Sequence, residues 1–197
     1  MIAWINFAIL ILASLLFLYY YMLSASPATR EKILGPRAYT ICGRDRLIAS
    51  VFEGITVINY IVYVFYPLQT PLPEKFPWPW WVSAVMAVAI AIPTLTLMFI
   101  GLRDAGEEAL RPKKEHTMYG GIYAKIRHPQ AAGEVFGWLA IAFLLNSPFL
   151  AVFSLIYFPI FVMMSFAEEQ DLLWRYGDAY AAYCKHTGAF WPKRNAR

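Results

Sequence analysis

Two short segments in the second half of the chain hold most of the side chains that could do chemistry. The first runs from His116 to Pro129 and contains two histidines, two tyrosines, the glycine pair Gly120-Gly121 and an Arg-His-Pro triplet. Paired glycines allow a tight turn and a close approach of a ligand to the backbone. Pro129 suits the first turn of a helix, whose free N–H groups favour an anion. The segment is therefore either a ligand site or a loop whose basic residues meet lipid phosphates.

The second segment is the acidic run Glu168-Glu169-Gln170-Asp171. Three acidic residues in a row of four polar ones do not suit an anionic lipid surface. They suit the hydroxyls or amine of a ligand, or a cation such as Arg127. A solvated helix turn is the alternative interpretation.

Two further carboxylates, Glu53 and Glu134, fall inside long apolar stretches. A charge within a membrane is costly, so such a residue faces a partner or a cavity. A neutral, hydrogen-bonded Glu near a helix end is the simpler alternative. The sequence leaves the role of both residues open.

The composition indicates lipid as the solvent of much of this chain. Of its 197 residues, 59% are hydrophobic and 15% charged, against about 25% charged in a soluble domain. The net charge of +4 predicts no nucleic-acid partner, because the longest basic run is Lys113-Lys114. His116, His128 and His186 are too far apart in sequence for a metal site, so we expect no metal.

The elements that must position these residues are membrane-spanning helices. A span needs roughly 17–25 apolar residues. We expect the first stretch to be a retained helix and not a signal peptide, because it has no basic n-region and is too long for an h-region. Only Asn146-Ser147-Pro148 separates the last two stretches, which predicts a tight helical hairpin. A C-terminal amphipathic helix over 172–183 follows from the spacing of its apolar residues. The sequence thus predicts an all-α integral membrane protein with about five transmembrane helices: 2–23, 47–66, 79–102, 131–145 and 149–166.

The basic residues alternate with these predicted spans. Five lie in residues 24–46, six in 103–130 and five in 167–197, out of 17 in the whole chain. The positive-inside rule then places the N-terminus outside and the C-terminus, with both candidate segments, on the cytoplasmic side. We expect a single membrane domain over 1–197, in which the first two helices occupy 1–66.

The two segments, in this order and separated by a hairpin, resemble the isoprenylcysteine carboxyl methyltransferase family and related membrane phospholipid methyltransferases. The resemblance covers roughly residues 100–197, which we expect to form the cofactor-binding core. It also includes the ending Thr187 to Lys193. The motifs that carry it are Gly121-Ile122-Tyr123-x-x-x-Arg127-His128-Pro129-x-x-x-Gly133, Glu168-Glu169-x-x-Leu172 and Tyr176-Gly177-x-x-Tyr180-x-x-Tyr183.

The resemblance implies a membrane-embedded methyltransferase that uses S-adenosylmethionine. Its acceptor would be lipophilic and enter from the bilayer, most simply the carboxylate of a prenylated cysteine. Two positions differ from the family pattern: Ala131 replaces a tyrosine, and Met164 replaces the arginine that binds the substrate carboxylate. No catalytic residue is identified. The cofactor-binding residues carried over are His116, Thr117, Met118, Tyr119, Tyr123, Arg127, His128, Pro129, Glu168 and Glu169.

Three alternatives remain open. A phospholipid amine is a second possible methyl acceptor for the same chemistry. Membrane sterol reductases share an Arg-His-Pro pattern before a helix and use NADPH. A non-catalytic scaffold that binds membrane lipid is the third, and it would tolerate alanine at His128 and Glu168. The oligomeric state is not readable from the sequence.

Overall fold

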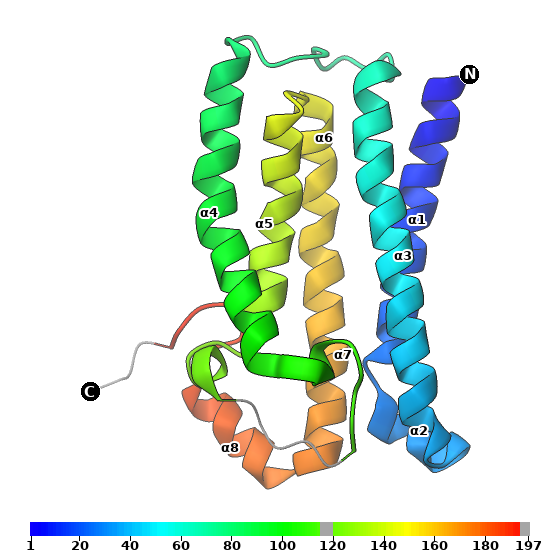
Figure 1. Cartoon of the computed structure of the whole chain (residues 1–197), viewed down its shortest axis with the longest axis vertical. Helices are drawn as coiled ribbons and strands as arrows, with labels where there is room; N and C mark the ends of the chain where they lie inside the picture. Colours follow the sequence, from blue (N-terminus) through cyan, green and yellow to red (C-terminus); the bar gives the residue numbers. More distant parts are fainter. Residues whose placement is uncertain (115–119, 194–197) are drawn as a thin grey trace.

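The computed structural model describes residues 1–114 and 120–193 of the chain, which are almost entirely helical. The long helices run parallel to one axis (Figure 1). Three single 3₁₀ turns, η1 (Gly106–Ala109), η2 (Gly121–Ala124) and η3 (Ser154–Ile156), interrupt the helical run. The α-helices are α1 (Ile2–Ser24), α2 (Pro27–Leu34), α3 (Arg37–Phe65), α4 (Trp80–Ala105), α5 (Pro129–Leu144), α6 (Pro148–Phe153), α7 (Tyr157–Tyr176) and α8 (Asp178–His186). The all-α prediction is confirmed for the part of the chain described.

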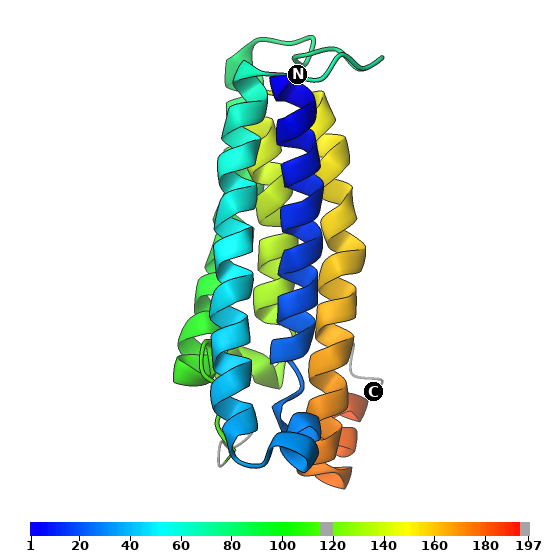
Figure 2. The same ribbon diagram turned by 90° about the vertical axis from the view of Figure 1, so that its right-hand side faces the viewer.

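The bundle consists of two helix pairs joined by a central helix. Helix α1 packs along α3, α4 packs along α5, and α7 contacts both α1 and α5. Figures 1 and 2 show α2 and α8 at one end, which also carries residues 106–114 and 120–128. We call this end the charged end. The opposite end carries the loop between α3 and α4.

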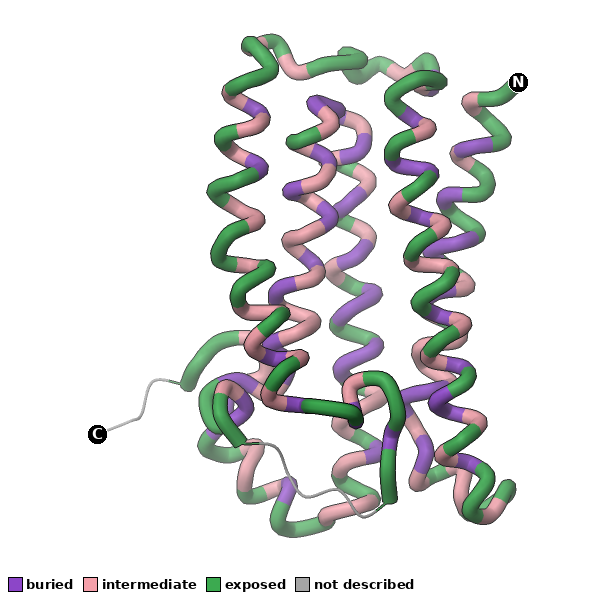
Figure 3. The backbone as a smooth tube through the Cα atoms, viewed as in Figure 1, coloured by how far each residue is buried: buried purple, intermediate pink, exposed green. Residues whose placement is uncertain are grey.

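Apolar side chains occupy both the inside and the outside of the bundle. The core is built around Leu10, Tyr60, Trp138, Leu150 and Tyr157, each at most 3% exposed. The outward faces of α3 and α4 are exposed along their length (Figure 3) and are themselves apolar, as in a protein surrounded by lipid. The protein is therefore an integral membrane protein.

Four helical segments are long and apolar enough to cross a membrane, against about five predicted. They are Ile2–Ser24, Arg37–Phe65, Trp80–Ala109 and Pro148–Tyr176. The predicted fourth span corresponds to α5, which has only 16 residues. At 1.5 Å per residue it covers about 24 Å, which is less than the roughly 30 Å of a hydrocarbon core.

The predicted hairpin joins α5 to α6, and its turn does not reach the end of the bundle opposite the charged end. Its turn lies lower than the outer ends of α3 and α4 in Figure 1. Asn146 takes a positive φ of 54° in this turn, and its Oδ1 accepts a hydrogen bond of 2.7 Å from Ser83 of α4. Trp80 Nε1 donates to the carbonyl of Leu144 at 3.0 Å. These contacts with α4 therefore fix the position of the hairpin turn along the bundle axis.

The contact between α4 and α5 depends on Gly133. A Cβ at this position would lie 2.4 Å from the backbone oxygen of Thr94 and 2.9 Å from Met98 Cβ. Real side chains do not approach that closely, so the two helices reach this spacing only because position 133 has no side chain. Helix α5 begins four residues earlier, and this close packing therefore fixes where the Arg-His-Pro triplet lies.

We expect Gly133→Val to lower the free energy of unfolding by about 1–3 kcal/mol, the usual cost of overpacking. Thermal unfolding in detergent, followed by circular dichroism, measures the change. Gly137→Ala is the matched control, because it lies on the same helix and a Cβ there meets nothing within 4 Å. An unchanged Tm in the valine variant would contradict the proposed role of the close contact.

The predicted amphipathic helix over 172–183 is wrong in its bounds. Helix α7 continues to Tyr176, and Gly177 then takes a φ of 53°, a conformation that stops a helix. Helix α8 begins at Asp178 and returns toward the core, where Tyr180 is buried. The break turns α8 across the charged end of the bundle instead of prolonging α7.

Candidate functional site

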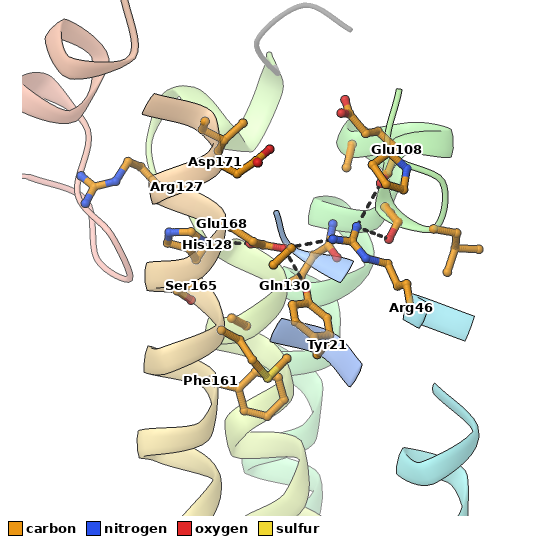
Figure 4. Close-up of a pocket in the computed structure, with 18 of the residues that line it drawn as sticks. Tyr21, Arg46, Glu108, Arg127, His128, Gln130, Phe161, Ser165, Glu168 and Asp171 are labelled. Carbon is orange, nitrogen blue, oxygen red and sulfur yellow. Dashed lines mark hydrogen bonds and ion pairs between the residues drawn. The ribbon is translucent and has the colours of Figure 1, made fainter. Parts of the chain in front are cut away.

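A cavity of about 380 Å³ lies between the two helix pairs and reaches the charged end (Figure 4). It falls within the roughly 300–1,000 Å³ of typical small-molecule sites. Every basic side chain described in its lining lies at the charged end: Arg46, Arg127, His128 and Arg175. The deeper lining comes from the spans and is apolar apart from carboxyl and hydroxyl groups: Phe17, Glu53, Met98, Glu134, Phe161, Met164 and Ser165. We call this second part the deep half.

The Arg-His-Pro triplet begins α5 and is held in place by the tail of the chain. His128 precedes the helix and Pro129 is its first residue. The backbone N–H groups of Arg127 and His128 donate to the carbonyls of Gly188 and Ala189, both at 2.9 Å. Residues 188–189 therefore fix the backbone of the triplet at the cavity wall.

Glu169 joins two side chains of this triplet. Its Oε1 accepts 2.8 Å hydrogen bonds from Arg127 Nε and is 2.8 Å from His128 Nε2. Arg127 also donates to the backbone carbonyls of Thr187 and Cys184. The predicted pairing of the acidic run with Arg127 is therefore present, and it ties α7 to the start of α5.

Glu168 lies at the centre of the cavity's ionic cluster. The Tyr21 hydroxyl donates to its Oε1 at 2.7 Å, and Arg46 Nη2 lies 3.6 Å from the same oxygen. His128 Nδ1 is 3.5 Å from the other carboxylate oxygen. Figure 4 shows these side chains converging from different helices. One carboxylate thus connects α1, α3 and α7 to the residue before α5.

His128 has a carboxylate beside each ring nitrogen. Burial disfavours its charged form, but the hydrogen bonds with Glu168 and Glu169 outweigh burial and raise the pKa of His128 above its usual value. In the protonated form, both ring nitrogens donate their protons to the two carboxylates. The imidazolium is the link that holds two neighbouring acidic side chains together.

We expect this link to make stability depend on pH. A raised folded-state pKa contributes stability that is complete below the unfolded pKa of about 6.5 and is lost as pH rises through the folded value. Unfolding experiments between about pH 6 and about pH 9 should therefore show stability falling more steeply in the wild type than in His128→Gln. His186→Gln, an exposed histidine at the end of α8, is the matched control. Equal slopes in the wild type and His128→Gln would exclude this contribution.

Tyr123 lies on η2 and lines the cavity from the charged end. Its hydroxyl accepts a 2.8 Å hydrogen bond from Gln130 Nε2, and its backbone carbonyl accepts one of 2.6 Å from the Tyr183 hydroxyl. Burial raises the pKa of Tyr123 well above its usual value, so its phenol is neutral at physiological pH. It contributes a hydroxyl and a ring face, not a charge.

The last acidic residue of the run, Asp171, caps the start of α2. Its Oδ1 accepts hydrogen bonds from the backbone N–H groups of Ala28 and Thr29, at 2.9 and 3.1 Å. These are free donors in the first turn of α2, which has no side-chain cap of its own. Asp171 therefore attaches α2 to α7 across the charged end.

The lining residues that the sequence interpretation missed include four with ionisable side chains: Tyr21, Arg46, Glu108 and Arg175. Arg175 and Glu108 form a buried ion pair of 2.9 Å, and Arg46 donates to the carbonyls of Glu108 and Ala109. An arginine directly before a predicted span was the available signal for Arg46. His116, Thr117, Met118 and Tyr119, expected to bind the cofactor, lie outside the described residues.

The residues present fit a polar, zwitterionic cofactor. Two buried polar atoms in the cavity lining, Ser165 Oγ and Arg175 Nε, have no hydrogen-bond partner within the described chain. Such atoms are costly unless a ligand or water satisfies them. The charged end also offers both carboxylates and guanidinium groups, which suit an amino acid moiety.

Buried ionic side chains converging on a cavity at the edge of a membrane bundle define a membrane-embedded enzyme site. A comparison with known protein families matches residues 80–179 to a family described as phospholipid methyltransferase. This covers α4, α5, α7 and both candidate segments, half of the chain. The chain belongs to this family of membrane methyltransferases. No curated protein and no solved structure matches it.

Proposed function

We propose that this protein transfers the methyl group of S-adenosylmethionine to the amine of a membrane lipid. The observation that carries the proposal is a single cavity with two chemically different parts. Its charged end has the ionic cluster around Glu168, and its deep half is apolar with carboxyl groups. A polar cofactor and a lipid can therefore meet inside one site.

The charged end supplies the groups that would hold the cofactor. Glu168 offers a carboxylate to an ammonium or to ribose hydroxyls, while Arg175, whose Nε has no partner among the described residues, offers a guanidinium group to a carboxylate. The sulfonium supplies a methyl group that is already activated toward a nucleophile. The protein must chiefly orient the acceptor and exclude water, which can contribute roughly 7–11 kcal/mol. The buried walls of this cavity suit that task.

The deep half supports an amine as the acceptor. The position where the resemblance places a carboxylate-binding arginine is Met164, which is 3% exposed and apolar. The basic lining residues are all at the charged end, whereas Glu53 and Glu134 line the deep half. Carboxyl groups complement an ammonium and repel a carboxylate. The family's description also names phospholipids.

A prenylated cysteine carboxylate is the second candidate acceptor. The sequence resemblance favours it, and Arg46 is a cation in the cavity wall. Against it, Arg46 already contacts Glu168 and donates to two backbone carbonyls. A carboxylate would have to compete with these partners.

The acceptor would enter from the bilayer between α3 and α4. These helices belong to different pairs, and both contribute to the cavity wall through Ser50 and Leu102. Ser50 is exposed although it lines the cavity, which suits an opening of the cavity at this point. With the charged end cytoplasmic, as the distribution of basic residues predicts, the acceptor would come from the inner leaflet.

The test is methyl transfer in reconstituted vesicles. Purified protein receives labelled S-adenosylmethionine with phosphatidylethanolamine, a prenylated cysteine or a lipophilic thiol as acceptor. We expect label in the aminolipid and cofactor binding by calorimetry in detergent. Thermal stabilisation by NADPH instead of S-adenosylmethionine would overturn the proposal in favour of a reductase. If label appeared only in the prenylated cysteine, the proposed acceptor would be its carboxylate and not the lipid amine.

A further inference from the structure

Glu53 and Glu134 come from different helices, α3 and α5, and line the same cavity on the deep side of the ionic cluster around Glu168. Glu53 is seven residues beyond Arg46 along α3, which places it about 10 Å deeper in the bundle. Glu134 lies in the second turn of α5. The two carboxyl groups are close enough to interact with one another, and Glu134 also feels the charge of Glu168. A proton shared between two neighbouring carboxyl groups relieves the repulsion between them.

A second observation in the same place points to a ligand. Ser165 of α7 is 4% exposed, lines the same cavity, and its hydroxyl has no partner among the described residues. A buried hydroxyl without a partner is costly unless a bound group satisfies it. Ser165 is one turn from Glu168, so a group that contacts its hydroxyl also lies near the charged end.

The chemistry of an amine acceptor explains why a carboxyl pair would be there. A lipid ammonium has no free electron pair and cannot attack a methyl group. It must first lose a proton, and in a low-dielectric cavity an ammonium beside a carboxylate gains by transferring the proton and neutralising both charges. A pair that shares one proton carries one negative charge, so it can accept a second proton.

We propose that Glu53 and Glu134 bind the ammonium of the acceptor and remove its proton, with the Ser165 hydroxyl orienting the amine. This inference rests on the proposed amine acceptor. The N–H bond of the ammonium breaks, an O–H bond forms on the pair, and the electron pair stays on nitrogen. Glu53 and Glu134 are then neutral carboxylic acids, and the neutral amine faces the charged end as a nucleophile.

The test compares glutamine variants at both positions with the wild type. Each single variant, Glu134→Gln or Glu53→Gln, leaves one carboxyl group that can still take the proton, whereas the double variant keeps the size of both side chains and leaves none. We expect kcat of the double variant with phosphatidylethanolamine to fall at least about 100-fold, the usual contribution of a general base, and the single variants to fall less. Glu134→Asp should recover part of this loss. Glu74→Gln, exposed in the loop between α3 and α4, is the matched control.

Binding measurements keep the test independent of activity. Calorimetry with S-adenosylmethionine should give an unchanged Kd in the double glutamine variant, which also shows that it folds. Native mass spectrometry of this variant should show weaker retention of phosphatidylethanolamine but not of phosphatidylglycerol. A wild-type kcat in the double variant, or equal lipid retention, would overturn this inference alone. A wild type inactive on every amine would instead overturn the proposed acceptor.

Discussion

Replacing Glu168 by glutamine is expected to lower S-adenosylmethionine affinity and methyl transfer by at least about 100-fold. The amide keeps the shape of the side chain but cannot balance the charges of Arg46 and His128, both of which face this carboxylate. The cofactor would lose a hydrogen bond to a charged group, which contributes about 1.5–3 kcal/mol, and would meet two basic side chains that the amide no longer balances. Every tenfold in affinity corresponds to about 1.4 kcal/mol, so the two effects together amount to about 100-fold or more. Calorimetry and labelled transfer measure both quantities.

The control for this prediction is Glu107→Gln. Glu107 is also acidic and paired, with Lys113, but its side chain is 77% exposed and does not line the cavity. Exposed pairs contribute about 0–1 kcal/mol, so this variant should behave like the wild type. If both glutamine variants bind the cofactor equally well, Glu168 is not part of its site.

Replacing Arg127 by alanine is expected to lower the free energy of unfolding by about 3 kcal/mol, the lower end of the range for a broken buried pair. The guanidinium joins Glu169 of α7 to the carbonyls of Thr187 and Cys184, and its side chain is only 12% exposed. Its loss leaves Glu169 with a single partner and releases the contact between α7, α8 and the tail. Thermal unfolding in detergent measures the stability.

A second readout separates a local from a global effect of the Arg127 variant. Hydrogen exchange of the Arg127 and His128 amides, which donate to Gly188 and Ala189, should accelerate more than exchange in α3. Arg111→Ala, an exposed arginine at the same end of the bundle, is the matched control. Uniform acceleration throughout the bundle would argue against a specific role in holding the tail.

The fold class could be predicted because membrane helices are recognisable from their length and hydropathy. The number of helices that cross the membrane completely could not be predicted. Helix α5 is short, and it forms a hairpin with the helices that follow it. Because a hairpin returns to its starting side, its flanking loops lie at one end whether or not it crosses completely. A count of basic residues therefore cannot distinguish a full span from a partial one.

The site could be predicted only in part. Tyr123, Arg127, His128 and Glu168 were expected, and all four line one cavity. Glu169 was expected to bind the cofactor, but its contacts hold Arg127 and His128. It therefore positions other residues of the site.

Two of the residues that were missed, Tyr21 and Arg46, belong to α1 and α3. Tyr21 is 147 positions away from Glu168 in the sequence, yet their side chains are hydrogen-bonded. No local spacing encodes a contact between helices that distant, because it arises from the packing of α1 against α7. The position of the break at Gly177 was also missed, since the apolar spacing continues across it.

The pairing of the tail with the Arg-His-Pro triplet has a consequence for the order of biosynthesis. The partners of Arg127 include Thr187, 60 positions later in the chain. During translation, α5 and its hairpin are synthesised well before the tail. For that time the Arg-His-Pro triplet therefore lacks its backbone hydrogen-bond partners. The last step in forming the site is the docking of a short extended segment. A nascent chain stopped before residue 187 would already span the membrane but would lack an organised reaction centre.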